Sequence, residues 1–408
     1  MVYGIGQFVN IISPLLITPY LIYVCGLEKL GIIAIGQSFA YILIVVVDYS
    51  SYIIGVKEVS INRNDNPLLE SLFKTIYATK AVLLLLVALV SLALIYAVPY
   101  FREEKVTFFF SFTIIFAQFL NPTWFFQGVE NFKWITIINV LSKVIYVFGV
   151  FFLVKTQTDY VFANLWMGLG SIIANLIGLF WILKVYGFSF KTTSFDAVKA
   201  LLIRDFSFCL SQLFFAIRNY SPVVIIGFFS GDFIAGQFRV VEQIINLFRT
   251  YLQLFFKFSY SYVCFAIDEN LKKGLTLWRK FNGFNFIFLV MLLALVLVFS
   301  TEILIFFKVD AAHLSEIENY LYLAVFIPVL IGITLPLEQL IFSLNKNKEY
   351  IRLTIISTIF NVLGLSVLMH AFGLTQAFFL LIFTEAGLAL IYCYVLKNEF
   401  NKLKHFVG

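Results

Sequence analysis

Long apolar stretches alternate with short polar segments along almost the whole chain. A helix needs roughly 20 apolar residues to cross the hydrocarbon core of a bilayer, and each stretch is about that long. The alternation therefore predicts an all-α polytopic membrane protein with about 12 transmembrane helices. The predicted spans lie at about residues 3–24, 32–56, 74–98, 106–128, 134–154, 160–183, 206–229, 233–256, 282–307, 319–343, 352–370 and 374–396.

The composition excludes a water-soluble fold for these 408 residues. Hydrophobic residues make up 61% of the chain and charged residues 13%, and the mean hydropathy is +0.95. Soluble domains carry only about 45–50% apolar residues and about 25% charged residues. No polar segment is long enough to form a separate soluble domain. The first apolar run starts at Val2 without a basic region before it, which predicts a retained helix rather than a cleaved signal peptide.

The distribution of Lys and Arg predicts the orientation of the chain. Of the 29 basic residues, 19 fall in loops on one side of the predicted membrane, 5 on the other side and 5 inside spans. Cytoplasmic loops carry an excess of Lys and Arg, so the richer side is predicted to be the cytoplasm, with both termini there. The net charge of +6 is spread over many short loops, so it does not indicate nucleic-acid binding.

Glycine and proline positions indicate an internal repeat of six spans. Gly26 and Gly31, at the start of the second span, match Gly231 and Gly236 at the start of the eighth. Further pairs keep the same order at offsets of about 203 to 218 residues: Pro19 with Pro222, Pro122 with Pro336, Asn131 with Asn345, and Thr136 with Thr354. Because six spans return the chain to the same side, the two halves are expected to be related by an axis along the membrane normal.

The repeat predicts two pseudo-equivalent six-helix lobes around a central cavity. The N-terminal lobe comprises residues 1–186 and the C-terminal lobe residues 206–397. A cytoplasmic inter-lobe loop at 187–205 joins them, and a cytoplasmic tail follows at 398–408. Two such lobes suit alternating access, in which one central site opens to each side in turn.

Sequence features of metalloproteins and ATPases are missing. The four Cys and three His residues show no metal-ligand spacing, and no Walker-type phosphate-binding loop is present. We therefore expect no metal, no cofactor and no ATP hydrolysis. The predicted external loops are too short to hold the catalytic domain of a membrane glycosyltransferase or polymerase, so we expect a protein that is not an enzyme.

A run between the fourth and fifth spans, Asn121-Pro-Thr-Trp-Phe-Phe-Gln-Gly-Val-Glu130, carries a recognisable motif. It resembles the signature of the O-antigen flippase (Wzx-like) family of polysaccharide transporters, within the multidrug/oligosaccharidyl-lipid/polysaccharide (MOP) exporter superfamily. The motif residues are Pro122, Trp124, Gln127, Gly128 and Glu130; Asp48-Tyr49, Gly55 to Ser60, Asn62 to Asp65, Lys80 and Lys155 to Tyr160 also match in order. The chain departs from the family at Ser50-Ser51, where Gly often follows the Asp-Tyr pair.

The resemblance implies the fold of MOP exporters and a specific cargo. That cargo is an undecaprenyl-pyrophosphate-linked oligosaccharide, moved from the cytoplasmic to the outer leaflet of the bacterial inner membrane. The product would feed the biosynthesis of O-antigen, which belongs to lipopolysaccharide, or of another surface polysaccharide. The implied partners are the lipid bilayer, the lipid-linked oligosaccharide and a glycan polymerase, with no nucleic acid.

Ionisable side chains inside spans are candidates for the transport site. Burying one at mid-bilayer costs several kcal/mol, with estimates from roughly 3 upward, so such residues usually face a bundle interior or an aqueous cavity. Arg and Lys are suited to phosphate, so we expect a cavity that attracts pyrophosphate through Lys80, Lys143, Arg218, Arg239 and Arg249. Carboxylates that titrate when buried are candidates for gating or for coupling to H⁺ or Na⁺: Asp48, Glu130, Glu242, Glu338 and Glu385.

Each of these residues also has a structural alternative. Lys80 and Lys143 lie where snorkelling to an interface competes with a cavity role. Arg218 precedes a proline kink and fits a structural pairing. Arg239 and Glu242 are three residues apart, on one helix face, where they either neutralise each other or form a proton-responsive pair. Arg249 has the same alternatives, and Glu130 also fits a plain interface carboxylate.

The sequence thus favours a flippase that works by alternating access coupled to an ion gradient. A multidrug or cation antiporter of the same superfamily is the first alternative, although drug exporters favour acidic cavities and five basic residues lie in these spans. A membrane glycan polymerase or transferase is the second alternative, and the short external loops disfavour it. A non-transporting assembly scaffold is the third.

Overall fold

The computed structural model describes residues 2–189, 193–344 and 346–407, and all regular elements in these ranges are helical. This confirms the predicted all-α class. The elements of the first half are α1 (Val2–Asp48), η1 (Ser51–Gly55), α2 (Val56–Ile61), α3 (Asn66–Ala97), α4 (Pro99–Glu103), α5 (Lys105–Leu120), α6 (Thr123–Gly128), α7 (Phe132–Leu153), η2 (Gln157–Val161) and α8 (Phe162–Tyr186). Those that follow are α9 (Phe195–Ser230), α10 (Asp232–Glu269), α11 (Leu271–Val298), α12 (Ser300–Phe306), α13 (Ala311–Ala324), α14 (Phe326–Ser343), α15 (Asn347–Ala371) and α16 (Leu374–Val407).

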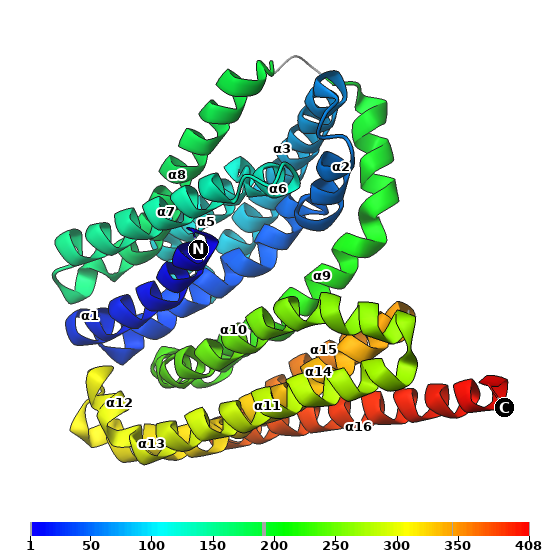
Figure 1. Ribbon diagram of the computed structural model, residues 1–408. Coiled ribbons are helices and arrows are strands. Elements are labelled where there is room, and N and C mark those ends of the chain that lie inside the picture. Colours follow the sequence, from blue (N-terminus) through cyan, green and yellow to red (C-terminus); the bar gives the residue numbers. More distant parts are fainter. Residues whose placement is uncertain (1, 190–192, 345, 408) are drawn as a thin grey trace. The chain divides into compact units, whose positions relative to one another are not determined.

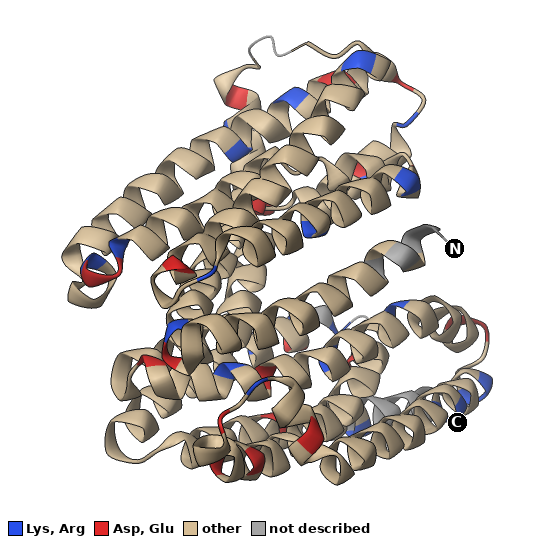
Figure 2. Cartoon of the chain, turned by 90° about the vertical axis from the view of Figure 1, so that its left-hand side faces the viewer, with Lys and Arg blue, Asp and Glu red and all other residues tan. Residues whose placement is uncertain are grey.

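Among the described residues, 10 helical segments are long and apolar enough to cross a membrane. The first of these, within α1, contains two predicted spans, because the backbone leaves helical geometry at Gly26. Helix α10 is not among the 10, yet it covers the predicted eighth span. The helices are therefore consistent with twelve crossings, and Figure 2 shows long stretches of helix without a charged residue.

The chain divides into two compact units, Met1–Gly236 and Gln237–Gly408. Helix α9, which contains the predicted seventh span, therefore belongs to the first unit, whereas the repeat places it in the second lobe. The lobe boundaries drawn from the repeat stay a prediction. Residues 190–192 of the predicted inter-lobe loop lie outside the described residues, as does Asn345 of the repeat.

In the first unit, α1 packs against α5, α7 and α9, while α8 packs against α5 and α7 (Figure 1). One end of this unit is filled by aromatic rings. Phe73, Trp124, Phe125 and Phe126 are buried there with apolar residues from α7, α8 and α9. Aromatic side chains bury large apolar areas, so this cluster fixes the positions of the short helices η1, α2 and α6 around it.

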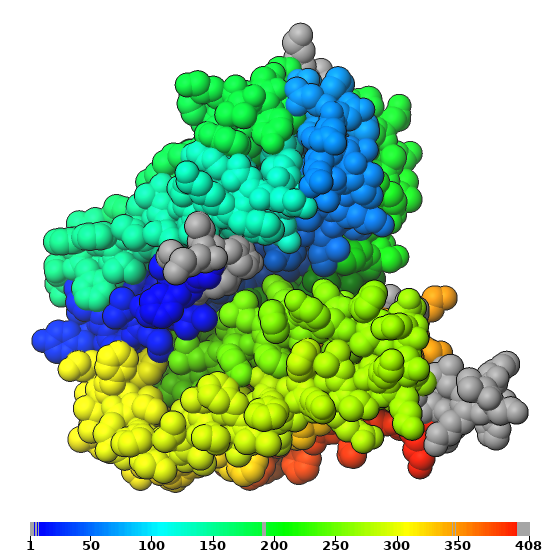
Figure 3. Space-filling model, viewed as in Figure 1, coloured from blue at the N-terminus to red at the C-terminus, as the bar shows by residue number. Residues whose placement is uncertain are grey.

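In the second unit, α14 and α16 pack on each other, and α15, α13 and α11 pack against them. Its core includes Val263, Ile341 and Tyr392, all fully buried. In both units the outward faces carry large apolar side chains, such as Leu85 and Leu89 on α3. Helix α3 forms part of the surface seen in Figure 3. Apolar side chains in such numbers at the surface suit contact with lipid.

Contacts between loops of the first unit separate into two groups that follow the predicted sides of the membrane. Tyr160 donates a hydrogen bond to Glu104, and the ammonium of Lys29 lies 5.1 Å from the Tyr160 ring centroid, so predicted external loops meet one another. Arg63 pairs with Glu130 at 3.1 Å, and Glu70 accepts from the Ser189 hydroxyl at 3.0 Å, so predicted cytoplasmic segments also meet one another. This grouping supports the predicted alternation of spans in this unit.

Candidate functional site

The most irregular backbone of the first unit follows the end of α1. Asp48 is the last residue of α1, and Tyr49 has a left-handed conformation with φ 55°. The next residues form η1, a single turn of π-helix, before the chain continues as α2. A non-glycine residue with positive φ is strained, and π-helical turns occur frequently at functional sites. The break between α1 and α2 is therefore a candidate functional site.

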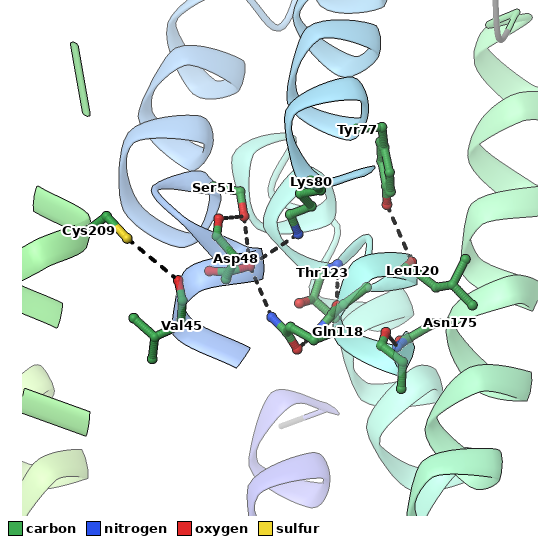
Figure 4. Close-up of polar contacts among 12 residues, drawn as sticks. Val45, Asp48, Ser51, Tyr77, Lys80, Gln118, Leu120, Thr123, Asn175 and Cys209 are labelled. Atoms are coloured by element: carbon green, nitrogen blue, oxygen red, sulfur yellow. Dashed lines mark hydrogen bonds and ion pairs between the residues drawn. The ribbon is translucent and has the colours of Figure 1, made fainter. Parts of the chain in front are cut away.

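The Asp48 carboxylate is the centre of a polar cluster at this break (Figure 4). Its Oδ1 accepts hydrogen bonds from Lys80 Nζ at 3.1 Å, Ser51 Oγ at 2.7 Å and Gln118 Nε2 at 3.0 Å. The Lys80 side chain is 1% exposed and that of Asp48 is 18% exposed. The structure thus brings together two residues that the sequence singled out. Lys80 does not snorkel to a surface; its charge is neutralised inside the unit.

Gln118 connects this cluster to the motif that carries the family resemblance. Its side-chain oxygen accepts a hydrogen bond from Asn121 Nδ2 at 3.1 Å, and Asn121 Oδ1 accepts one from the backbone N–H of Thr123 at 2.9 Å. Thr123 begins α6, so the polar chain runs from Asp48 into that helix. Gln118 is not among the candidate residues of the sequence analysis. Its position four residues before Pro122 is the signal that singles it out.

The motif residues form α6 and its ends, and they pack against α2 and the aromatic cluster beside the α1–α2 break. Trp124 is buried within the aromatic cluster. A Cβ added at Gly128 would lie 2.5 Å from Cγ1 of Val59, so only glycine lets α6 approach α2 this closely. Gln127 is half-buried, and Pro122 is buried at the start of α6. The motif therefore acts first as a support for the segment that carries Asp48.

Glu130 follows α6, two residues after its last residue Gly128, and has a left-handed conformation with φ 59°. Its carboxylate is exposed and forms an ion pair with Arg63 at 3.1 Å. Both residues follow the ends of short helices on the predicted cytoplasmic side. Glu130 therefore lies outside the buried Asp48 cluster, and its role stays a prediction.

On the opposite side of the break, Ser50 contacts a buried carboxylate that the sequence analysis missed. Ser50 Oγ donates to Asp205 Oδ2 at 2.5 Å, and Asp205 is 2% exposed. Arg204 Nε donates to Asp205 Oδ1 at 2.7 Å, and the same guanidinium donates to Glu58 of α2 at 2.5 Å. Tyr49 also donates to the carbonyl of Leu202 in α9. The departure from the family pattern at Ser50-Ser51 was the available signal, since each serine here binds a carboxylate.

Lys143 and Arg218 are the other predicted cations of the first unit. In the part of the chain that the structure describes, Lys143 makes no hydrogen bond or ion pair, and its side chain is half-buried on α7. Arg218 is half-buried on α9, four residues before Pro222, which lies inside the same helix. Lys143 is therefore a cation within an apolar helix that lacks a described counter-charge.

The remaining predicted residues lie in the second unit. Arg239 and Glu242 form an ion pair at 2.7 Å, so the structure brings this predicted pair together. Arg249 donates to Asn246 at 3.1 Å, and Glu338 accepts from Tyr392 at 3.4 Å. Glu385 is buried. The predicted cavity cations are thus divided between the two units, and their joint role in one cavity stays a prediction.

The second unit contains a neutral counterpart of the Asp48 cluster. Asn282 Nδ2 donates to Gln339 Oε1 at 3.1 Å, and Gln339 Nε2 donates to Ser259 Oγ at 2.7 Å. Asn282 and Gln339 belong to the predicted ninth and tenth spans, and Ser259 lies on α10 three residues after the predicted eighth span, whereas Asp48, Lys80 and Gln118 come from the second, third and fourth spans. The helices that carry the corresponding spans of each half therefore meet at a polar junction, and among the described residues the ion pair lies at the junction of the first half. Folding such a junction does not require charge.

Among the described residues, no group of three or more His, Cys, Asp or Glu side chains is arranged to hold a metal ion. The candidate site of the first unit is instead an ion pair with neutral donors around it. Burying such a pair is expensive in desolvation, so its retention calls for a reason beyond stability.

Comparison with known proteins gives a family and a fold. A family model described as polysaccharide biosynthesis protein matches residues 1–264. A protein of Escherichia coli (strain K12) named "Putative O-antigen transporter" is 24% identical over 277 residues, which cover 68% of this chain and 67% of that protein. A protein of Shigella dysenteriae with the same name is 23% identical over 241 residues, covering 58% of this chain and 59% of that protein.

Among solved structures, the chain is similar to an inward-facing multidrug resistance MATE family transporter of the MOP superfamily. The TM-score is 0.65 at 14% sequence identity, and the match covers 100% of this chain and 96% of the other. At this identity the likeness shows the fold alone. That fold is the one that the resemblance of the motif implied.

Proposed function

This chain belongs to the polysaccharide biosynthesis protein family, and with the MOP transporter fold as a second premise we propose that it is a flippase. Its cargo in this proposal is an undecaprenyl-pyrophosphate-linked oligosaccharide, carried from the cytoplasmic to the outer leaflet of the bacterial inner membrane by alternating access. The names of the E. coli and Shigella relatives support an O-antigen unit as the sugar part.

The observation that carries the proposed cargo is the environment of Lys143. Helix α7 exposes Val144, Phe148 and Phe152 in a stripe at four-residue spacing, which suits contact with lipid. Lys143 and buried Thr136, two turns away, share another face of the helix. A half-buried ammonium without a described counter-charge, turned away from the lipid stripe, suits an anionic ligand such as pyrophosphate.

The paired charges fit a different part of the cycle. Lys80 already has a carboxylate partner, and so does Arg239. In the proposal these two pairs respond to the coupling ion, H⁺ or Na⁺, while Lys143, Arg218 and Arg249 attract the pyrophosphate. Each unit has its own polar junction, and the one described in the second unit is neutral. Of these two junctions, the one with the Asp48–Lys80 pair is therefore the stronger candidate for ion coupling.

The test follows lipid-linked oligosaccharide in cells depleted of this protein, with the leaflet that exposes the sugars as the readout. Wild type should restore exposure on the outer leaflet, whereas Lys143→Ala should leave complete units on the cytoplasmic leaflet. Lys143→Arg should retain part of the activity because it keeps the positive charge. Lys133→Ala, which removes an exposed lysine at the start of the same helix, is the matched control and should behave as wild type.

Each outcome bears on a separate part of the proposal, provided that the variants reach wild-type amounts in the membrane. Complete units that are already exposed outside in depleted cells would overturn the flippase and favour a later enzyme or a scaffold. Wild-type flipping by Lys143→Ala would leave the flippase standing and remove Lys143 from the cargo site.

A further inference from the structure

Two glycine-marked turns of the first unit touch in a reciprocal way. Gly26 has φ 82° and ψ 171°, and Gly231 has φ 89° and ψ 167°, so the two turns share one backbone conformation. A Cβ added at Gly31 would lie 2.0 Å from the carbonyl oxygen of Asp232. A Cβ added at Gly236 would lie 1.9 Å from the carbonyl oxygen of Leu27.

This contact has the form of a local two-fold interface. Leu27 follows Gly26 as Asp232 follows Gly231, and Gly31 and Gly236 each come five residues after the first glycine of their turn. The carbonyl of Leu27 lies against Gly236, and the carbonyl of Asp232 lies against Gly31. An isologous contact of this kind forms when two equivalent surfaces meet across a two-fold axis. Backbones at this distance leave no room for any side chain larger than hydrogen at Gly31 or Gly236.

Asp232 adds a titratable group to the glycine contact. Tyr100 Oη donates to Asp232 Oδ1 at 2.5 Å, and the Tyr100 ring lies 5.1 Å from the Phe228 ring between centroids. Tyr100 belongs to the short helix α4, so α4 contacts the second of the two turns, at Asp232. The other charged groups that face Asp232 are Glu104 before α5 and, on α1, Glu28 and Lys29.

We propose that the turns at Gly26–Gly31 and Gly231–Gly236, with Asp232 and Tyr100, form a proton-sensitive latch that holds the predicted external side closed. Release of the latch would let the external turn of α1 around Gly26 separate from the start of α10 for discharge of the cargo. The purpose of the latch rests on the transport cycle proposed above, whereas its opening can be measured without a transport assay.

The sign of the pH dependence follows from the burial of Asp232, which lies outside the predicted spans. Desolvation raises the pKa of the Asp232 carboxyl above its usual value, with Glu104 and Glu28 acting in the same direction. In an opened latch the carboxyl would be hydrated and its pKa would be ordinary. The latched state therefore binds the proton more tightly. Its stability is fully present below the ordinary pKa and is lost as the external pH rises through the raised pKa.

The experiment measures how readily a thiol within the latch is alkylated from outside. Cys25, Cys209, Cys264 and Cys393 are replaced by Ser, and Leu27→Cys is introduced, since Leu27 is buried in the latch. A membrane-impermeant maleimide is applied to intact cells between about pH 5 and about pH 8. Thiolate reactivity itself rises with pH, so labelling is expressed relative to Arg102→Cys, an exposed position on α4.

We expect relative labelling of Leu27→Cys to rise several-fold as the external pH increases. Adding Asp232→Asn should hold the labelling low and independent of pH, because the amide mimics the protonated carboxyl. Adding Gly31→Ala should raise labelling at every pH. A relative labelling that does not change with pH, or that falls as pH rises, would overturn the proton-sensitive latch. Because no cargo enters this measurement, it can fail while the flippase stands, and it can succeed if the flippase fails.

Discussion

The ammonium of Lys80 lies 3.1 Å from Oδ1 of Asp48, and this ion pair joins α3 to the end of α1 in the interior of the first unit. Ser51 and Gln118 donate to the same carboxylate oxygen, so three donors surround one acceptor. In the second unit, the corresponding junction that the structure describes is built from the neutral side chains of Asn282, Gln339 and Ser259. A fold of this kind therefore does not require the Asp48–Lys80 pair. Removing both charges of the pair should then change transport more than it changes the free energy of unfolding.

Lys80→Met should destabilise the protein by about 3–5 kcal/mol, because it leaves the Asp48 charge buried without its partner. The double variant Asp48→Asn/Lys80→Met should recover most of that loss while transport loses its dependence on the ion gradient. Thermal unfolding in detergent measures the first effect and flipping in vesicles with an imposed gradient measures the second.

Lys74→Met on the same helix is the control: it breaks the more exposed pair with Glu70 and should cost at most about 1 kcal/mol of stability. A double variant as unstable as Lys80→Met would contradict this account.

Asp205→Ala should loosen α9 from the α1–α2 break. It removes the acceptor for Ser50 and for Arg204, and hydrogen bonds to a charged group contribute about 1.5–3 kcal/mol each. The natural thiol of Cys209 reports on this contact, since it is buried with its Sγ 3.9 Å from the carbonyl oxygen of Val45. Alkylation of Cys209, in a chain whose other three cysteines are replaced by Ser, should become several-fold faster. Asp196→Ala, at an exposed position of the same helix, should leave the rate unchanged.

The helical class and the predicted alternation of spans followed from hydrophobic periodicity, because bilayer thickness fixes the length of each apolar run. The repeat was visible in Gly26 and Gly231 because only glycine adopts their shared positive φ without strain. Division into compact units was less predictable. Helix α9 belongs to the first unit through contacts such as Ser50 with Asp205, which local sequence patterns do not encode.

The candidate site was only partly visible in the sequence. Asp48 and Lys80 stood out because ionised residues in apolar spans are costly, but their partnership depends on how two helices cross. Gln118 and Asp205 are not ionised residues inside a predicted span, and the signals that pointed to them were only indirect: the place of Gln118 before Pro122 and the departure from the family pattern at Ser50-Ser51. Glutamine is frequent between helices, and Asp205 lies next to Arg204 in a segment that resembles an ordinary polar connection. Their roles arise from tertiary contacts that place them against one irregular turn.

Gly128→Ala should destabilise the α6–α2 contact by about 1–3 kcal/mol, the usual cost of overpacking. The added methyl group would meet Val59 Cγ1 at 2.5 Å and the backbone oxygen of Val56 at 3.0 Å, so it has no free direction. Adding Val59→Ala should recover part of the loss, as measured by thermal unfolding. Gly283→Ala is the control: that exposed helical glycine has nothing within 4 Å of an added Cβ, and the change should be neutral or slightly stabilising. Equal effects of the two substitutions would argue against a packing role for Gly128.

Tyr100→Phe should shift the pH at which the external latch opens to a higher value. The Tyr100 hydroxyl donates to the ionised carboxylate of Asp232 and so lowers the pKa that desolvation has raised. Without this donor the Asp232 pKa rises further, and the latch stays protonated and closed to a higher external pH. The shift should be about one pH unit or less, seen in the relative labelling of Leu27→Cys by an impermeant maleimide. Tyr96→Phe, an exposed position on α3, should leave the opening pH where it is in wild type. A shift to lower pH would mean that Tyr100 stabilises the protonated carboxyl instead, and the proposed direction of the switch would then be wrong.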